Sequence, residues 1–155
     1  MLAKMLSDFK KNIIETWDGY YHYDKHSPLH TDAGVPFTIE LKRKWFGKME
    51  GTVQDDFTKG GMKEKGKIIG KMNDHAISFI KRMPKFSAYD ELGNSIKLDI
   101  PHPLLHYKGS YNSLQKKYEG AWRMDPMIFR KDNRHYKSPG SLGIWEMTRR
   151  DTSQV

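Results

Sequence analysis

Cysteine and long apolar runs are both missing from this sequence. The chain has 155 residues and no cysteine, which excludes disulfide scaffolds, thiol nucleophiles and cysteine-rich zinc sites. No stretch reaches the roughly 18 consecutive apolar residues that a membrane-spanning helix needs. The opening residues, MLAKMLSDFKKNII, have too short an apolar run before Asp8 and Lys10 for a secretory signal. We therefore expect a cytoplasmic protein without a membrane span.

Aromatic residues, in contrast, are abundant. The chain holds 4 Trp, 8 Tyr and 7 Phe, with 37% hydrophobic and 30% charged residues. This is too aromatic a composition for an intrinsically disordered chain. The length suits one domain with its own core and is short for two. We expect a single domain over residues 1–155.

The net charge is strongly positive. There are 27 Lys and Arg against 19 Asp and Glu, a formal charge of +8. Such a charge attracts nucleic acid or an acidic membrane surface. However, acids are interleaved with the cations along most of the chain, and the densest cluster, KRK at 42–44, follows a Glu. A solvated basic surface is the favoured interpretation, and nucleic acid stays an open alternative partner.

The dominant sequence period is two, which is typical of half-buried strands. In PFTIELKRKW, Phe37, Ile39 and Leu41 share one face and polar residues occupy the other. Similar segments are expected as strands at 13–23, 46–54, 62–72, 75–83, 95–100, 104–112, 117–124 and 142–149. Turn signals such as HTDAG, KGG, MND and KSPG separate them at the spacing of hairpins. The pattern predicts an antiparallel meander.

Two segments lack a clear strand pattern. Within residues 1–12, Leu2, Met5, Leu6 and Phe9 would line one side of a short helix, and a frayed extension is the alternative. Residues 125–140 are expected to form a long loop over one end of the sheet, or to contain a short strand around Met127 to Phe129.

A glycine recurs two residues before a large aromatic. The pairs are Gly19 and Tyr21, Gly109 and Tyr111, Gly120 and Trp122, and Gly143 and Trp145. Residues two apart in a strand share a face, so each glycine leaves room for an aromatic side chain from the neighbouring strand and lets its own strand bend. Small barrels need this mixture of small and large interior residues. We therefore predict an all-β fold, a single closed up-and-down antiparallel barrel of about 8–10 strands.

These motifs resemble a known group of barrels. The segments TWDGYYHY, MEGTVQDD, GKIIGKM, ISFIKRM, HYKGSY, YEGAWRM and GIWEMTR resemble a widespread, functionally uncharacterised small domain of calycin type, the group that includes the lipocalins and the avidins. The resemblance extends from about Thr16 to Arg149 and implies fold more than function. It also implies that Trp17 on the first strand packs under Arg149 from the last strand. Here Gly19 follows the tryptophan, a departure from the lipocalin G-x-W order.

The candidate binding residues are those expected to face the barrel interior. An aromatic wall would line a ligand cavity, and the alternative is a barrel filled by its own aromatics. Asp55 and Lys81 fall in phase with the inward residues, where an unpaired charge is very costly, so they are expected either to pair or to lie in water at strand ends. The candidate ligand-binding set is Trp17, Tyr21, Phe37, Asp55, Lys81, Tyr107 and Trp122.

No catalytic or metal motif stands out. Pro28 prevents one helix from presenting His22, His26 and His30 together, His102 and His106 are only two ligands, and no cofactor is expected. The leading hypothesis is a protein that binds a small, partly apolar ligand. One alternative is an isomerase or lyase that uses Asp55 or a histidine as base and Lys81 or a tyrosine as its partner. The other is nucleic-acid or protein interaction through an outer basic face, with Tyr20, His22 and Arg43 as contacts.

Overall fold

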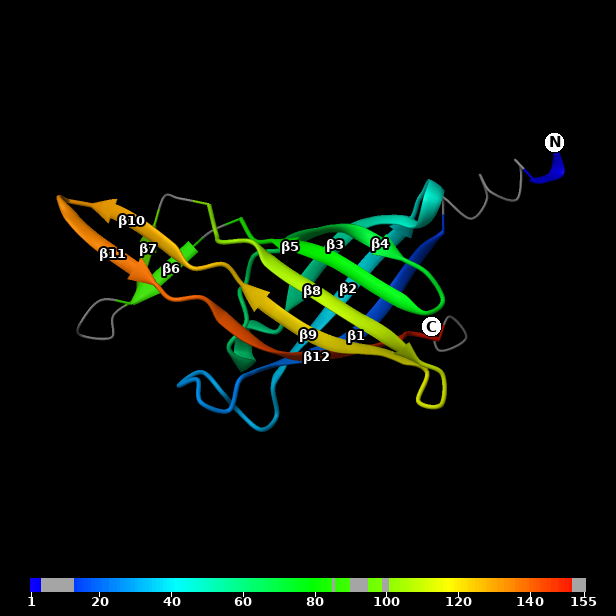
Figure 1. Ribbon diagram of the computed structural model, residues 1–155, viewed down its shortest axis with the longest axis horizontal. Coiled ribbons are helices and arrows are strands. Elements are labelled where there is room, and N and C mark those ends of the chain that lie inside the picture. Colours follow the sequence, from blue (N-terminus) through cyan, green and yellow to red (C-terminus); the bar gives the residue numbers. More distant parts are fainter. Residues whose placement is uncertain (4–12, 85, 90–94, 99–100, 152–155) are drawn as a thin grey trace.

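The chain folds into a closed antiparallel β-barrel (Figure 1). The computed structural model describes residues 1–3, 13–84, 86–89, 95–98 and 101–151. The barrel order is β1-β12-β9-β8-β5-β4-β3-β2. Its strands are β1 (Ile14–Tyr23), β2 (Val35–Arg43), β3 (Lys48–Asp55), β4 (Gly66–Met72), β5 (Ala76–Arg82), β8 (Leu105–Asn112), β9 (Lys117–Met124) and β12 (Ser141–Arg149). The predicted all-β, up-and-down barrel is confirmed.

Four further strands form two separate hairpins. One consists of β6 (Phe86–Tyr89) and β7 (Ser95–Leu98), and the other of β10 (Met127–Lys131) and β11 (Arg134–Ser138). The predicted strand around Met127 is confirmed, but the segment 125–140 is a hairpin rather than a long loop. Two short 3-10 turns, η1 (Trp45–Gly47) and η2 (Phe57–Lys59), complete the described elements. Most of the segment 1–12 lies outside the described residues.

The alternating pattern places apolar side chains inside the barrel. In β2, Phe37, Ile39 and Leu41 are buried, and in β5 the same holds for Ile77 and Phe79. Tyr107, Trp122 and Trp145 are buried as well, whereas Tyr111 is half buried. Because successive strand residues point to opposite faces, this burial follows directly from the period of two.

Glycines face the large aromatics across the strand ladder. Gly143 lies opposite Trp122 and Gly120 lies opposite Trp145 in the pairing of β9 with β12. A Cβ atom added to Gly143 would stand 2.7 Å from Trp122 Nε1 and collide with the His22 carbonyl oxygen. The space left by the missing side chain is therefore used by a neighbouring strand, as the spacing of the motif predicts.

The two ends of the barrel differ in their connections. One end, which we call the turn end, carries the short connections 44–47, 73–75 and 113–116. The other, the loop end, carries the long connections 24–34, 56–65, 83–104 and 125–140, and both extra hairpins lie on this side (Figure 1). No helix in the described part of the chain is long and apolar enough to cross a membrane. The chain thus builds a short-looped end and an elaborated end.

Candidate functional site

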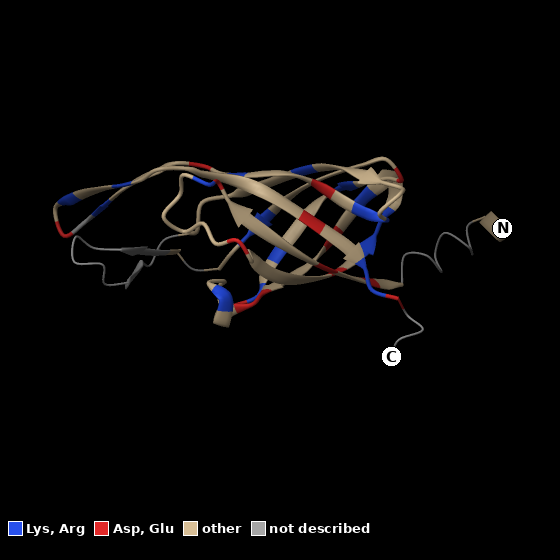
Figure 2. Ribbon diagram, turned by 90° about the horizontal axis from the view of Figure 1, so that it is seen from below, with Lys and Arg blue, Asp and Glu red and all other residues tan. Residues whose placement is uncertain are grey.

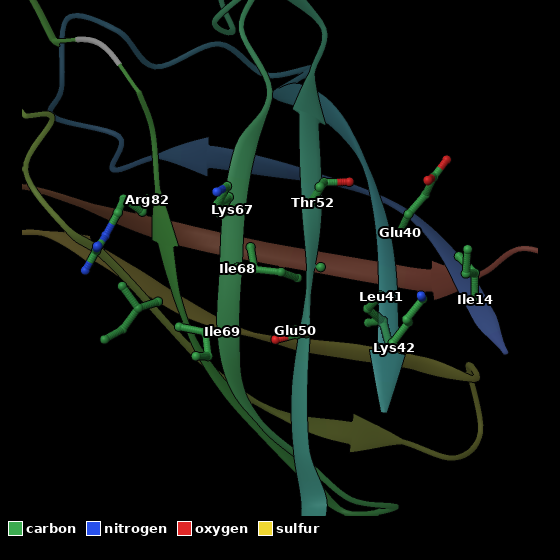
Figure 3. Close-up of a pocket in the computed structure, with 12 residues that line it drawn as sticks. Ile14, Glu40, Leu41, Lys42, Glu50, Thr52, Lys67, Ile68, Ile69 and Arg82 are labelled. Carbon is green, nitrogen blue, oxygen red and sulfur yellow. The ribbon is translucent and has the colours of Figure 1, made fainter. Parts of the chain in front are cut away.

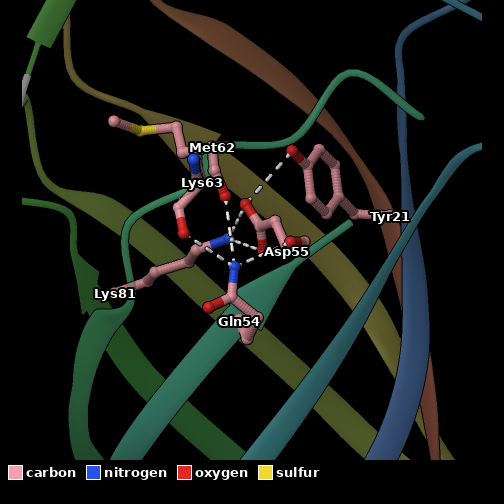
Figure 4. Close-up of polar contacts among 6 residues, drawn as sticks. All are labelled: Tyr21, Gln54, Asp55, Met62, Lys63 and Lys81. Carbon is pink, nitrogen blue, oxygen red and sulfur yellow. Dashed lines mark hydrogen bonds and ion pairs between the residues drawn. The ribbon is translucent and has the colours of Figure 1, made fainter. Parts of the chain in front are cut away.

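A buried ion pair lies at the loop end of the barrel (Figure 4). Lys81 Nζ stands 2.8 Å from Asp55 Oδ1 and 2.9 Å from Oδ2. Each side chain is only 3% exposed. The expectation that both charges lie in water at strand ends is therefore wrong. The alternative expectation, that two inward-facing charges form a pair, is confirmed.

Neighbouring backbone fixes the Asp55 side of this pair. Asp55 ends β3 opposite Phe37 of β2, and the connection that follows folds back over it. Gln54 Nε2 donates to the Lys63 carbonyl oxygen at 3.1 Å and to that of Met62 at 3.4 Å. A Cβ atom on Gly61 would collide with the Asp55 side chain. The connection 56–65 therefore packs directly against Asp55 and shields it from water.

Aromatic rings surround the ion pair on its other sides. The Tyr21 hydroxyl donates to Asp55 Oδ2 across 3.5 Å, the limit of a hydrogen bond. Lys81 Nζ lies 5.0 Å from the Tyr21 ring centroid and 6.0 Å from that of Tyr107, within the range of a cation–π contact. Trp122 packs edge-on against Tyr21 at 5.7 Å and stacks on Tyr107 at 6.3 Å. The ion pair thus lies within an aromatic box.

Burial and charge also set the protonation of this box. Burial lowers the pKa of Lys81, and the adjacent Asp55 carboxylate opposes that shift. Burial, with the Asp55 charge second, raises the pKa of both Tyr21 and Tyr107. Both phenols therefore keep their protons at neutral pH, and that of Tyr21 donates to Asp55.

His102 belongs to the same end of the barrel, which the sequence reasoning missed. Burial lowers the pKa of His102, and the backbone bond to Pro103 opposes that shift. The charge of Lys81 lowers this pKa and that of Asp55 raises it. Its ring lies edge-on to Phe86 of β6 at 5.5 Å, and Phe86 in turn contacts Phe129 of β10 at 5.9 Å. The spacing of His102 to His106 did not predict this position, because His102 lies in the long connection before β8 rather than in a strand.

Trp17 lies apart from the other predicted ligand-binding residues. Tyr21, Phe37, Asp55, Lys81, Tyr107 and Trp122 gather toward the loop end, whereas Trp17 lies toward the turn end. It is opposite Arg149 in the backbone pairing of β1 with β12. Its ring contacts Tyr118 at 5.4 Å. The predicted set is therefore divided between two ends of the barrel.

A second buried carboxylate marks the turn end. Glu15 is 6% exposed and accepts two hydrogen bonds from Arg43, at 2.7 Å and 3.2 Å. This bond to Glu15 raises the pKa of Arg43. Arg43 is thus paired with Glu15 at the turn end, and 38% of its side chain stays exposed.

Two grooves lie on the outer wall formed by the described strands. One, of about 630 Å³, crosses β2 to β5 and combines Glu40 and Glu50 with Lys67 and Arg82 (Figure 3). The other, of about 940 Å³, crosses β4, β5, β8, β9 and β12. Positions of Lys and Arg are interspersed with positions of Asp and Glu along the barrel strands (Figure 2). This mixture of charges does not single out a polyanion partner.

The histidines do not assemble a metal site within the part of the chain that the structure describes. His30 Nδ1 contacts the Tyr23 carbonyl oxygen at 2.8 Å, and His106 pairs with Asp125 at 2.9 Å. These rings bond to backbone and to a carboxylate, each in a different place.

Comparisons with known protein families, curated proteins and solved structures find no match. The fold assignment therefore rests on the strand order and register alone. The site must be interpreted from its own chemistry.

Proposed function

We propose that this protein binds a small, partly apolar ligand at the loop end of the barrel, against the Asp55–Lys81 pair. The observation that carries the proposal is a paired ammonium and carboxylate, each 3% exposed, inside a box of aromatic rings. Binding pockets typically combine an apolar lining with a few placed polar groups. The ion pair and the Tyr21 hydroxyl would orient the polar part of the ligand, and Tyr107 and Trp122 would contact its apolar part.

The cost of a buried ion pair supports a functional role. Removing two charges from water costs several kcal/mol per ion, and their attraction often only offsets that cost. Apolar side chains of similar size would fill the same space with equal or greater stability. Asp55 and Lys81 are therefore better explained by what they contact than by the stability they provide.

The arrangement of the connections supports the same end of the barrel. The long connections and both hairpins lie at the loop end, where loops carried on a rigid scaffold commonly hold binding residues. We also propose kinship with the calycin barrels. The strand order and the pairing of Trp17 with Arg149 support it.

Titration with N-phenyl-1-naphthylamine, a neutral fluorescent apolar probe, tests the proposal. The variant Asp55→Leu/Lys81→Met removes both charges with side chains of similar size, so it should fold. We expect saturable fluorescence enhancement with the wild type and at least about a tenfold weaker Kd with this variant, equivalent to about 1.4 kcal/mol.

The matched control is Glu15→Met/Arg43→Met, which removes the ion pair of the turn end. This control should bind the probe as the wild type does. Equal binding by all three proteins would show that the loop-end charges take no part in binding, and no saturable binding by the wild type would count against the proposal itself.

A second candidate function is proton transfer by the same residues. Asp55 and Lys81 lie within hydrogen-bond distance of each other, and burial lowers the pKa of Lys81, which favours release of its proton. An isomerase or lyase would turn over a bound carbonyl compound, and Lys81→Met would abolish turnover. Binding without turnover across a panel of carbonyl compounds favours the binding function.

A further inference from the structure

The turn end contains a pocket with a different chemistry from the loop end. It has a volume of about 370 Å³ and is lined by Trp17, Arg43, Asp74, Tyr111, Lys116, Tyr118 and Arg149. This volume is in the range of small-molecule sites, which begins at about 300 Å³. Aromatic rings and cations therefore line one pocket.

The charges of this pocket favour an anion. Arg43, Lys116 and Arg149 all line it, and Asp74 is the carboxylate in its lining. A second carboxylate, Glu15, accepts both bonds of the Arg43 contact and lies 3.7 Å from the Arg149 guanidinium. Arg149 is 50% exposed, so its guanidinium is accessible at the pocket. Three cations against these two carboxylates leave a positive excess.

A buried donor in the pocket wall also calls for a partner. Trp17 is 4% exposed, and its indole N–H finds no hydrogen-bond acceptor among the described residues. By contrast, Trp122 Nε1 donates to the His22 carbonyl oxygen at 3.1 Å and Trp145 Nε1 to that of Ala121 at 3.1 Å. Buried polar groups are normally satisfied, so an unpaired indole N–H in the wall of a pocket leaves a donor for which a bound group would be the partner.

The backbone conformation of Lys116 is a third, independent observation in favour of a binding site at the turn end. Lys116 has φ of 54° in the turn between β8 and β9, the left-handed region that glycine or asparagine usually occupies. Strained conformations of this kind cluster at functional sites. Here the turn carries a long cation in place of the residue that its backbone favours.

We propose that the turn end is a second binding site, for a small aromatic carboxylate. Its carboxylate contacts Arg149 and Lys116, and its ring packs against Trp17, Tyr111 and Tyr118. Guanidinium groups pair with carboxylates through strong, charge-assisted hydrogen bonds. This site is distinct from the loop-end site, and neither depends on the other.

The test uses phenylacetate as the probe and two-dimensional ¹H–¹⁵N spectra as the readout. The chain has 4 tryptophans, and Trp17→Phe identifies the indole resonance of Trp17. Phenylacetate should move that resonance saturably at concentrations up to about 10 mM, while the Trp122 resonance stays in place. The neutral analogue 2-phenylethanol should leave the Trp17 resonance unmoved.

Two arginine variants distinguish phenylacetate binding in this pocket from nonspecific attraction to the positively charged surface. Arg149→Met should weaken phenylacetate binding by about tenfold or more, the effect expected for one lost charge-assisted contact. The matched control is Arg150→Met, because Arg150 is the next residue and pairs with Asp18 at 2.7 Å instead. Arg150→Met should bind as the wild type does.

Three results would overturn the proposal. They are an unmoved Trp17 resonance at about 10 mM phenylacetate, equal binding of 2-phenylethanol, and equal losses in Arg149→Met and Arg150→Met. Each of these results leaves the loop-end proposal unaffected, because N-phenyl-1-naphthylamine is neutral and reports on Asp55 and Lys81.

Discussion

The ammonium of Lys81 contacts both carboxylate oxygens of Asp55, at 2.8 Å and 2.9 Å, although their strands are not neighbours in the barrel. β4 lies between β3 and β5, so the two side chains meet through the barrel interior. This contact therefore links two walls of the barrel beneath the loop end.

The single variant Lys81→Met should destabilise the protein by about 3–5 kcal/mol, because it leaves the Asp55 charge buried without a partner. Asp55→Leu/Lys81→Met should recover most of that loss, since no buried charge remains. Urea unfolding at neutral pH measures both free energies. A cost below about 1 kcal/mol for the single variant would mean that Asp55 is not buried as a charge.

Tyr107→Phe should make stability less sensitive to alkaline pH. Burial raises the pKa of the Tyr107 phenol in the folded protein, whereas in the unfolded chain it loses its proton near pH 10. The stability that this phenol provides is thus present below about pH 10 and falls above it by about 1.4 kcal/mol per pH unit.

Urea unfolding between about pH 9 and pH 11 tests this prediction, because the difference between wild type and variant isolates one proton. The opposing contribution of Lys81 is common to both proteins and cancels in this difference. Parallel pH profiles for the two proteins would show that Tyr107 ionises as freely in the folded state as in the unfolded chain.

Gly143→Ala should destabilise the barrel by about 1–3 kcal/mol, the usual cost of overpacking. The added Cβ would press on Trp122 Nε1 and on the His22 carbonyl oxygen, the two groups joined by a 3.1 Å hydrogen bond. Thermal unfolding, with the Trp122 indole resonance as a local probe, measures the effect. An unchanged melting temperature and resonance would contradict this packing.

Lys116→Gly should stabilise the protein by about 0.5–1 kcal/mol, because glycine adopts the left-handed region without a Cβ penalty. Lys116→Ala, which removes the same charge and keeps the strain, is the control and should bring no gain. Both variants should weaken phenylacetate binding. Equal stability of Lys116→Gly and Lys116→Ala in urea unfolding would refute the strain at this position.

The sequence period of two predicted the barrel and which residues face its interior. It did not predict how far along the barrel axis each of these residues lies. Trp17 and Tyr21 share a face, yet the rise of four residue steps along the strand separates them by about 13 Å. One therefore lies toward the turn end and the other at the loop end. In the same way, the phases of Asp55 and Lys81 predicted that both point inward, whereas their contact depends on the register of β3, β4 and β5.

The second hairpin illustrates a signal that was present and not used. Asp132 and Asn133 both have positive φ, at 51° and 63°, as two-residue hairpin turns require. Asn and Asp tolerate this conformation, so the pair DN between MIFRK and RHYKS indicates a hairpin. The position of His102, by contrast, follows from a long connection whose path no local pattern encodes.

The most direct test of the account is a ¹H–¹⁵N spectrum of the tryptophan indoles during titration with N-phenyl-1-naphthylamine. Trp122 lies beside Tyr21 and Tyr107 in the aromatic box, and Trp17 lies at the turn end. We expect a saturable shift of the Trp122 resonance and none for Trp17. A shift of Trp17 alone, or no shift of either resonance, would contradict a ligand site at the Asp55–Lys81 end.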